Sequence, residues 1–279
     1  MSVSIVTDSG CDLPWDLVDK HGITVVPLTV RFGAEELVAG RNLSPSEFWQ
    51  RCAASEQLPE TAAPSPGAFD EAFRAAAARG DDAVVCVNLS SRLSATIQAA
   101  QAAAMAVADV IPVRVVDSLS ATMGQGMVVL AAVRAAEAGE GGAAVAGAAE
   151  SAAASMKVYG TLDTLDFLKK GGRIGGAQAF LGSLLSVKPT IEVVDGKVEP
   201  GPKVRTRSKA LQFLADRVRD KASSIEHLAV LNGAAPDCDA LLDLLGQHFP
   251  RERIVVGDIG PVIGAHTGPA TIGVAYQAG

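Results

Sequence analysis

The chain has 279 residues, and its hydrophobic fraction of 48% is sufficient for the core of one large or two medium-sized domains. A formal net charge of -7 argues against a general nucleic-acid binder and against a protein that binds anionic membrane surfaces. The four cysteines lack the spacing of a metal site or a disulfide framework, and no stretch has the pattern of a signal peptide or an integral membrane segment. We therefore expect a cytoplasmic protein without a metal or a cofactor.

Three strand–loop–helix units follow one another in the first half of the chain. Apolar runs at 2–6, 82–88 and 113–117 predict buried strands, and each run leads into a polar loop and then a helix. The run at 82–88 does not alternate, which is typical of a sheet covered on both faces. Repeated units of this kind predict a parallel, doubly wound sheet, with ligand loops at the carboxyl ends of its strands.

A β-rich run at 23–30 and two proline-started helices lie between the first two units. Ser44 opens a capping box with proline at the first helical position, and Ser65 is predicted to cap the second helix. Thr61 lies in the proline-rich loop between these helices and has no structural role of this kind. Its hydroxyl is therefore predicted to be free for a ligand.

Hydroxyl groups gather after the strand at 82–88, where Ser90, Ser91 and Ser94 lead into an Ala-rich helix. Hydroxyls and backbone N–H groups at a strand-to-helix junction can bind an anion. The alternative is that one of these serines only caps the helix. On the first interpretation, all three are candidate ligand-binding residues.

The character of the sequence changes after residue 155. The Ala- and Gly-rich segment before it predicts two helices with a break near Gly141-Gly142, and we place a domain boundary between 155 and 156. The second domain, 156–279, contains two strands joined by the Asp195-Gly196 turn, which indicates an antiparallel sheet. Its other expected elements are an apolar helix ending at Ser186, a helix over 210–222 and a β-α-β unit from His227 to Gly257. The predicted fold class is a parallel-sheet, Rossmann-like α/β domain followed by an α+β domain with a mixed or antiparallel sheet.

Basic side chains alternate at Lys203, Arg205 and Arg207. Alternation on an extended segment directs them to one face, and together with Arg173 they predict a docking surface for a partner. The alternative is a solvated sheet edge that is protected by charge.

His266 and Thr267 lie side by side near the C-terminus, in the sequence Ala265-His266-Thr267-Gly268-Pro269. Two apolar, strand-like runs flank them, so both side chains are expected on a turn that presents polar groups into an apolar pocket. The alternative is an ordinary β-turn with a histidine on the surface.

Taken together, these residues resemble the DegV family of bacterial fatty-acid-binding proteins. The resemblance covers essentially the whole chain and rests on the order and number of its motifs. These are Val6-Thr-Asp-Ser9, Thr61-Ala-Ala-Pro-Ser-Pro-Gly67, Leu89-Ser-Ser-Arg-Leu-Ser-Ala-Thr96, Val116-Asp-Ser118, Lys170-Gly-Gly-Arg-Ile-Gly175, Lys203-Val-Arg-Thr-Arg207 and Ile259-Gly-Pro-Val-Ile-Gly-Ala-His-Thr-Gly-Pro269.

The resemblance implies that one long-chain fatty acid lies in a tunnel between the two domains. Its carboxylate is expected to meet hydroxyls of Thr61 and of the loop with Ser90, Ser91 and Ser94, with His266 and Thr267 beside them. In family members that act with a kinase, the acid is presented to an ATP-dependent fatty acid kinase subunit that makes acyl-phosphate. The family pattern often has other residues at Ala62, Ala95 and Ala270, which puts the hydrogen bonds of the head group in doubt.

Two other functions are open at this point. A serine hydrolase or acyltransferase would use Ser91 or Ser94 with His266, although the sequence has no GxSxG or Ser-x-x-Lys motif and no identifiable group to orient the histidine. A regulatory lipid-binding module without a kinase partner would need the same pocket.

Overall fold

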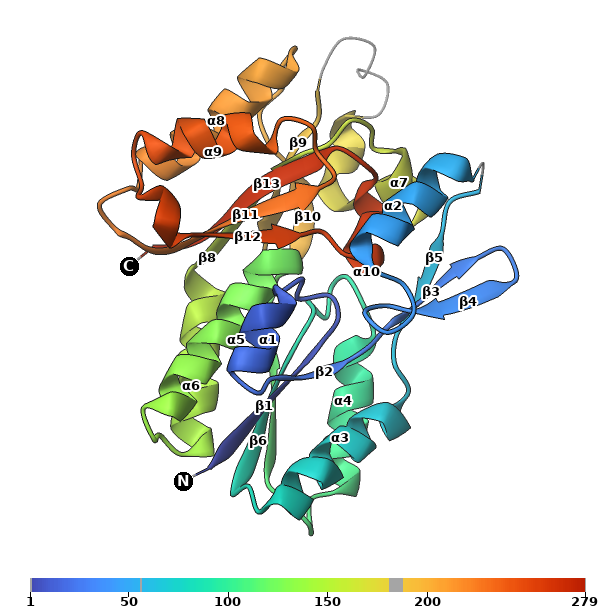
Figure 1. The fold of residues 1–279 in the computed structure, drawn as a ribbon, viewed down its shortest axis with the longest axis vertical. Helices are drawn as coiled ribbons and strands as arrows, with labels where there is room; N and C mark the ends of the chain where they lie inside the picture. The colour runs from blue at the N-terminus through green and yellow to red at the C-terminus, as the bar shows by residue number, and fades with distance from the viewer. Residues whose placement is uncertain (1, 56, 181–187, 279) are drawn as a thin grey trace.

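The computed structural model describes residues 2–55, 57–180 and 188–278, and its strands form three sheets (Figure 1). The first is parallel, with the order β2-β1-β6-β7. Its strands are β1 (Val3–Asp8), β2 (Thr24–Val26), β6 (Ala83–Asn88) and β7 (Val113–Asp117). The predicted parallel sheet is thus confirmed.

Helices cover both faces of this sheet. On one face, α3 (Pro66–Arg79) and α4 (Thr96–Ala106) pack against Val84 and Cys86. On the other, Val85 and Val87 belong to the core that contains α5 (Thr122–Glu137) and α6 (Gly142–Ser155). Every residue of β6 is buried for this reason, as its lack of alternation predicted. The short helix α1 (Trp15–Lys20) follows β1.

The second sheet has six strands in the order β10-β9-β8-β13-β11-β12, and only β11 and β12 are parallel. Its strands are β8 (Met156–Thr161), β9 (Thr190–Val194), β10 (Lys197–Pro200), β11 (Ile225–Gly233), β12 (Ile254–Asp258) and β13 (Thr271–Ala278). Asp195 and Gly196 both have positive φ, 47° and 77°, as a tight hairpin between β9 and β10 requires. The mixed, largely antiparallel sheet agrees with the prediction for the second half.

Helices α8 (Arg207–Arg219) and α9 (Cys238–Gly246) cover the outer face of the six-stranded sheet through residues such as Leu214 and Leu241. Helix α5 covers part of its inner face, and one continuous core cluster contains both Val85 of β6 and Leu231 of β11. All strands of the parallel sheet precede residue 155 and all strands of the six-stranded sheet follow it. Because the core runs through both, the domain boundary stays a prediction.

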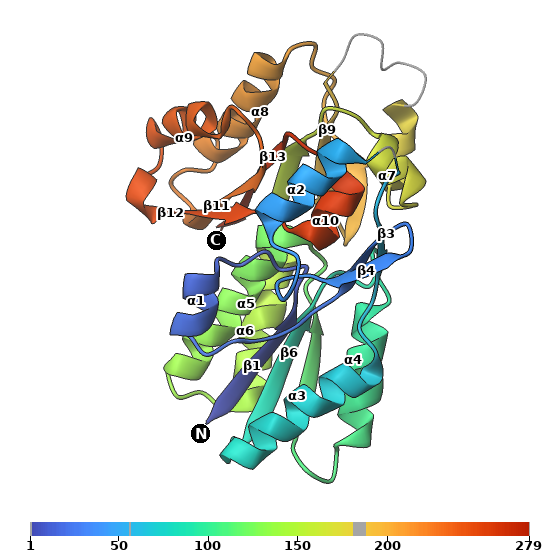
Figure 2. The ribbon, with the colours of Figure 1, turned by 45° about the vertical axis from the view of Figure 1, so that its right-hand side comes forward.

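The third sheet is small and antiparallel, with the order β4-β3-β5. Its strands are β3 (Thr29–Phe32), β4 (Glu35–Val38) and β5 (Glu60–Ala62). The run predicted at 23–30 therefore divides between two sheets, at a proline that lacks the N–H needed to continue a ladder. Together with α2 (Pro45–Ala54), this sheet packs on α10 (Pro261–Thr267), and Figure 2 shows α2 beside that helix.

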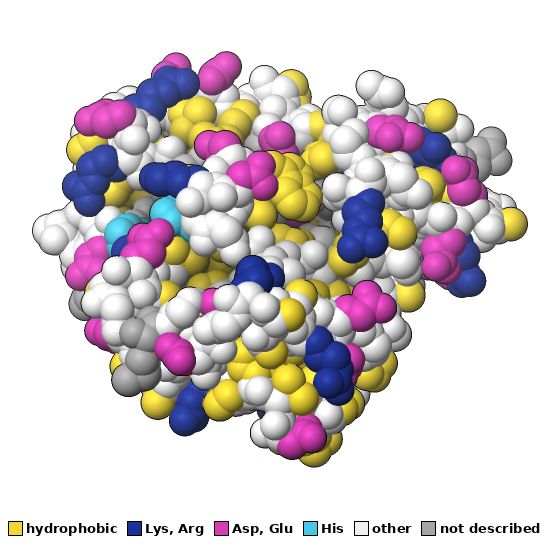
Figure 3. All heavy atoms as spheres, turned by 60° about the horizontal axis from the view of Figure 1, so that its bottom comes forward, with side chains coloured by type: hydrophobic (Ala, Val, Ile, Leu, Met, Phe, Trp, Pro, Cys, Tyr) yellow, Lys and Arg dark blue, Asp and Glu magenta, His cyan; other side chains and the backbone are white. Residues whose placement is uncertain are grey.

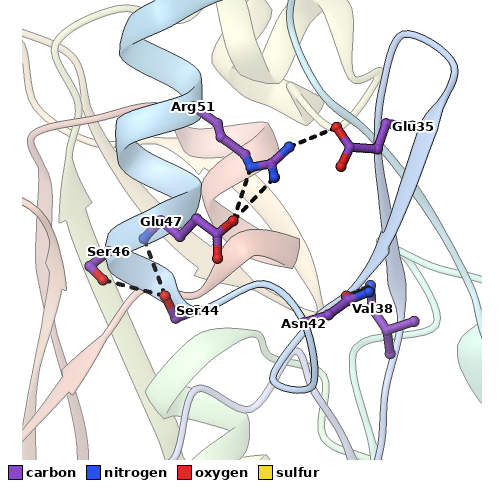
Figure 4. Close-up of polar contacts among 7 residues, drawn as sticks. All are labelled: Glu35, Val38, Asn42, Ser44, Ser46, Glu47 and Arg51. Atoms are coloured by element: carbon purple, nitrogen blue, oxygen red, sulfur yellow. Dashed lines mark hydrogen bonds and ion pairs between the residues drawn. The ribbon is translucent and has the colours of Figure 1, made fainter.

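Polar contacts tie α2 to the β3–β4 hairpin, as Figure 4 shows. Arg51 of α2 donates to Glu35 of β4 (2.8 Å) and to Glu47 one turn earlier (3.1 Å). Ser44 accepts from the Glu47 N–H, so the predicted cap is confirmed. Such exposed ion pairs contribute little energy but fix orientation. The buried ring of Phe48 supplies the contact with α10.

Helix α10 corrects the expectation of a strand before His266. The run Pro261–Ala265 is helical, with Gly260 as the N-cap and proline in the first turn. Val262 and Ile263 suggested a strand, but a short helix buried on all sides shows no periodicity that would distinguish it. Elsewhere, α8 begins at Arg207 rather than 210. The helix predicted to end at Ser186 appears as a 3-10 helix over Gly175–Phe180, and the rest of that prediction lies outside the described residues.

Asp12 joins the loop after β1 to the start of α10, because its Oδ1 accepts a hydrogen bond from the Gly260 N–H at 3.0 Å. Burial raises the pKa of Asp12 from 3.8 to about 8, and the charge of Asp258 acts in the same direction. The folded protein therefore binds more protons than the unfolded chain between these two values. As a result, Asp12 makes the free energy of unfolding fall as the pH rises through this window.

We expect Asp12→Asn to remove this fall while keeping an oxygen for the Gly260 N–H. The variant should gain stability over the wild type as the pH is raised from about 5 to about 8, because only the wild type must then either hold a proton or bury a charge. Urea denaturation of both proteins at the two pH values measures the difference. A difference that does not change with pH would contradict a buried, protonated Asp12.

Candidate functional site

An apolar cavity lies between the inner face of the six-stranded sheet and the strand ends of the parallel sheet. Its volume is about 90 Å³. The apolar lining comes from Leu28, Leu89 and Leu93 on the parallel-sheet side, from Val158, Ile191, Val193, Leu231 and Ile272 on the six-stranded sheet, and from Val262 and Ile263 of α10. A dry, apolar interior of this kind suits a hydrocarbon chain.

Two glycines explain why side chains do not fill this space. Gly160 of β8 and Gly273 of β13 are directly opposite each other in the sheet, and both line the cavity. A Cβ atom at Gly273 would lie 2.4 Å from the Tyr159 carbonyl oxygen and 3.0 Å from Leu231 Cδ1. The sheet therefore has a bare patch below the cavity.

Polar side chains line one end of the cavity: Thr61, Ser94, Arg173, His266 and Thr267. Three of them, Thr61, Arg173 and His266, also line a wider cleft of about 610 Å³, which is bordered by Glu60 and Lys170. The polar end therefore lies where an apolar interior meets a wider polar cleft.

Thr61 and His266 are hydrogen-bonded, with 2.8 Å between Thr61 Oγ1 and His266 Nε2. Thr61 lies on β5 and His266 in the last turn of α10, so the packing of the small sheet on α10 brings them together. Gly171, at the end of α7 (Asp166–Lys170), lies against the imidazole, because a Cβ there would be 2.2 Å from Nδ1. The Lys-Gly-Gly-Arg motif thus provides room for the histidine.

His266 is neutral at neutral pH. Burial, and secondarily the charge of Arg173, lowers the pKa of His266 to about 4. Its Nδ1 is buried and has no hydrogen-bond partner among the described residues. A catalytic histidine is usually oriented by a group at this second nitrogen. The ring therefore offers one polar atom to the site rather than a proton relay.

Arg173 supplies the positive charge at the polar end. Its Nε donates to the Leu93 carbonyl oxygen at 3.0 Å and its Nη1 donates to the Gly171 carbonyl oxygen. These bonds hold the half-buried guanidinium between the loop after β6 and the end of α7. Arg173 was predicted to lie on a docking surface, and it lines the wider cleft together with His266.

The three predicted serines have different environments. Ser94 lines the cavity, and its Oγ is 2.9 Å from Thr96 Oγ1. Ser90 is fully buried and donates to the Gly196 carbonyl oxygen at 2.8 Å, which fixes the β9–β10 turn. Ser91 is exposed, and its N–H donates to Asp117. Neither Ser90 nor Ser91 is among the described residues that line the cavity.

Thr267 lines the cavity, but its hydroxyl donates to the Ile263 carbonyl oxygen one turn back in α10. It can therefore accept a hydrogen bond from a ligand more readily than donate one.

The alternating basic residues have different environments, and their role in docking stays a prediction. Arg207 makes two hydrogen bonds to Asp237, at 2.7 and 2.8 Å, and lies in the first turn of α8. Lys203 Nζ is 5.7 Å from the centre of the Phe180 ring, while Arg205 is exposed. On the face shown in Figure 3, Lys and Arg side chains are interspersed with Asp and Glu.

The departures from the family pattern lie outside the lining of the apolar cavity. Ala62 and Ala95 are exposed, and neither is among the described residues that line the polar end. Ala270 has a φ of 57°, a conformation that favours glycine.

An apolar pocket was predicted, but neither the residues that line it nor the role of Gly171 was. A pair of glycines within buried strands, such as Gly160 and Gly273, was the available signal for the cavity, because glycine in a strand often marks a close approach of a ligand or of backbone.

Comparison with known proteins identifies the family. The model described as "Uncharacterised protein, DegV family" matches residues 2–279. The chain belongs to the DegV family. A DegV domain-containing protein of Streptomyces coelicolor is 43% identical over 276 residues, which cover 98% of this chain and 97% of that protein.

Solved DegV structures have the same fold. A DegV family protein from Thermus thermophilus, described as binding fatty acid, has a TM-score of 0.91 at 35% identity and full coverage of both chains. DegV of Bacillus subtilis, described as a fatty acid binding protein, has a TM-score of 0.89 at 28% identity, also with full coverage of both chains. The predicted family and fold class are thus confirmed.

The described residues contain neither a metal-binding cluster of side chains nor a membrane-spanning helix. Within 2–55, 57–180 and 188–278, no three or more His, Cys, Asp or Glu side chains are grouped so that they could hold a metal ion. In the same ranges, no helix has the length and hydropathy to cross a membrane.

The neutral state of His266 predicts a pH-dependent stability. The unfolded chain binds a proton at His266 near pH 6.5, whereas the folded protein does so only near pH 4. The free energy of unfolding should therefore fall by about 3 kcal/mol as the pH drops through this window, and His266→Gln should not show this loss.

Denaturation curves of wild type and His266→Gln between about pH 4 and 7 measure this effect. The difference between the two proteins cancels contributions from other titrating groups, including Asp12. Parallel curves for the two proteins would show that His266 titrates normally and is not buried as described.

Proposed function

We propose that this DegV protein, in the cytoplasm, binds one long-chain fatty acid in the apolar cavity and presents its carboxylate to an ATP-dependent kinase partner that forms acyl-phosphate. The observation that carries this proposal is an apolar cavity that ends at the hydrogen-bonded pair Thr61–His266, where a wider cleft begins. Family members from Thermus thermophilus and Bacillus subtilis, both described as fatty acid binding, support the ligand class.

The acyl chain supplies the affinity. Burial contributes about 0.8 kcal/mol per methylene, so a chain of about sixteen carbons offers on the order of 10 kcal/mol before ordering costs. The lining of leucine, isoleucine and valine side chains matches this chemistry.

The polar end supplies the orientation. A carboxylate that leaves water needs charge-assisted hydrogen bonds, because an unpaired charge would cost several kcal/mol. Thr61 and Ser94 can each donate a hydroxyl hydrogen bond to the carboxylate. The neutral His266 can keep its hydrogen bond to Thr61 or bond to the carboxylate in place of Thr61. Arg173 adds a positive charge whose position is fixed by its hydrogen bond to the Leu93 carbonyl oxygen.

The cleft gives a partner access to the head group. A phosphoryl group transferred to the carboxylate would approach from the side of Lys170 and Arg173, whose positive charges can stabilise the additional negative charge. Exposed Arg205 and Lys203 are the candidates for partner binding, whereas Arg207 is already paired with Asp237. In this assignment the kinase performs the chemistry and this chain has no catalytic residue.

The contacts of His266 argue against a serine hydrolase. Its Nε2 is bonded to Thr61, and Ser94 is bonded to Thr96 instead. Ser91 is exposed and outside the lining of the cavity.

Ligand binding is tested on the purified protein. We expect mass spectrometry of an organic extract to detect a bound fatty acid in the wild type, and we expect Thr61→Val to weaken fatty acid affinity about 10- to 100-fold, because a hydrogen bond to a charged group is lost. Titration of delipidated protein with a fluorescent fatty acid measures the affinity.

The matched control is Thr29→Val on β3 of the same small sheet, because Thr29 does not line the cavity as described and its loss should leave affinity unchanged. A wild type that neither carries nor takes up a fatty acid would refute the proposed function.

Partner binding is tested separately. We expect Arg205→Ala to reduce recovery of an ATP-dependent kinase subunit in a pull-down from the native cell while fatty acid binding is retained, because Arg205 is exposed and outside the cavity lining. Arg114→Ala, an exposed arginine on β7, is the control. Equal recovery by both variants, or the absence of a kinase from the wild-type sample, would count against this half of the proposal.

A further inference from the structure

A second cavity, of about 140 Å³, adjoins the apolar one at the end away from Thr61. Four residues line both cavities: Val158, Tyr159, Glu192 and Val193. The two spaces are therefore separated only by a short stretch of β8 and β9.

Two valine side chains form this partition. Val158 and Val193 are directly opposite each other on the antiparallel strands β8 and β9, so their side chains lie on the same face of the sheet and are in contact range. Both pack with the core on the inner face, where the apolar cavity lies. Tyr159 points to the outer face, where its ring stacks on Tyr276 and meets Phe213 edge-on.

Helix α5 packs against Val158 and holds this part of the partition in place. A Cβ at Gly124 would lie 2.5 Å from Val158 Cγ2, so the helix comes close enough to hold that valine against the sheet. Val193 is less constrained, because it is only partly buried.

The second cavity has a mixed lining. Its apolar residues come from the end of α6, the start of β8 and the loop before α5: Ala153, Ala154, Met156 and Leu119. Lys157 and Asp195 are further lining residues, and Leu119 and Val194 are 38% and 41% exposed. It thus combines apolar walls with charged groups near solvent.

We propose that the cross-strand pair Val158–Val193 sets the length of acyl chain that this protein holds, and that the second cavity accommodates the terminal carbons of chains that extend past the pair. This inference rests on the proposed fatty acid binding but concerns the opposite end of the ligand. Val193 lines both cavities, so shortening its side chain to alanine joins them and extends the space available to the chain. We choose Val193 for this change because it is the less constrained of the two valines.

The test compares chain-length profiles. Delipidated wild type and Val193→Ala are each incubated with an equimolar mixture of saturated fatty acids of about 12 to 20 carbons, and the bound acids are quantified by mass spectrometry. Each methylene newly enclosed favours binding roughly fourfold, so two more enclosed methylenes raise the preference for the longer acid on the order of tenfold. Val193→Phe shifts the profile in the opposite direction.

Val230→Ala is the matched control, because Val230 is a fully buried valine of the same sheet that packs on the outer face. It removes the same atoms and disturbs folding comparably, but the profile of bound acids stays that of the wild type. Circular dichroism confirms that each variant is folded.

The outcomes separate the two proposals. A wild type that binds fatty acids, with a Val193→Ala profile that matches it, overturns the role of the valine pair and leaves fatty acid binding intact. An equal shift in Val230→Ala also overturns that role, because general loosening would then explain the result. A wild type that binds no fatty acid overturns both.

Discussion

The hydrogen bond between Thr61 and His266 is the contact on which the site depends. It joins residues 205 positions apart and lies where the apolar cavity meets the wider cleft. Neither residue reaches this place through its own local structure. Thr61 is there because α2 and the small sheet pack on α10 through the buried ring of Phe48, and His266 is there because Gly171 leaves room for its imidazole. Anything that separates α2 from α10 would therefore open the polar end before it disturbed either large sheet.

The cavity itself follows from how two sheets share one helix. Helix α5 packs on both, which explains why almost every residue in its middle is buried, but a single helix cannot cover the whole inner face of six strands. The facing glycines Gly160 and Gly273 lie within the uncovered part, and the strand ends of the parallel sheet close it from the opposite side. An empty apolar cavity costs packing energy that a bound chain would restore.

The sequence was sufficient for β1, β6 and β7, for the helix caps and for the family, since these depend on local pattern. Ser44 and Ser65 each cap the helix that they were predicted to cap, and β6 is buried on both faces as its composition indicated. The polar end could be predicted only in part. Thr61 lacked a local role, and its partner is indeed distant, but nothing local distinguished Ser90, which fixes a hairpin, from Ser94, which lines the cavity. The helix α10 was predicted as a strand, because its packing depends on contacts with segments far away in the chain.

The polar groups that could recognise a head group are gathered at one end of the cavity, which is consistent with the proposed role as a carrier. At the polar end, a neutral imidazole lies beside a fixed guanidinium, so an arriving carboxylate meets one positive charge that is already held by carbonyl groups. The carboxylate would favour protonation of His266, because an opposite charge raises the pKa that burial and Arg173 lower. At the far end, the lining combines the valine pair Val158–Val193 with Tyr159 and Glu192. In the proposed function, the polar end would recognise the carboxylate and the far end would select the chain by its length and width.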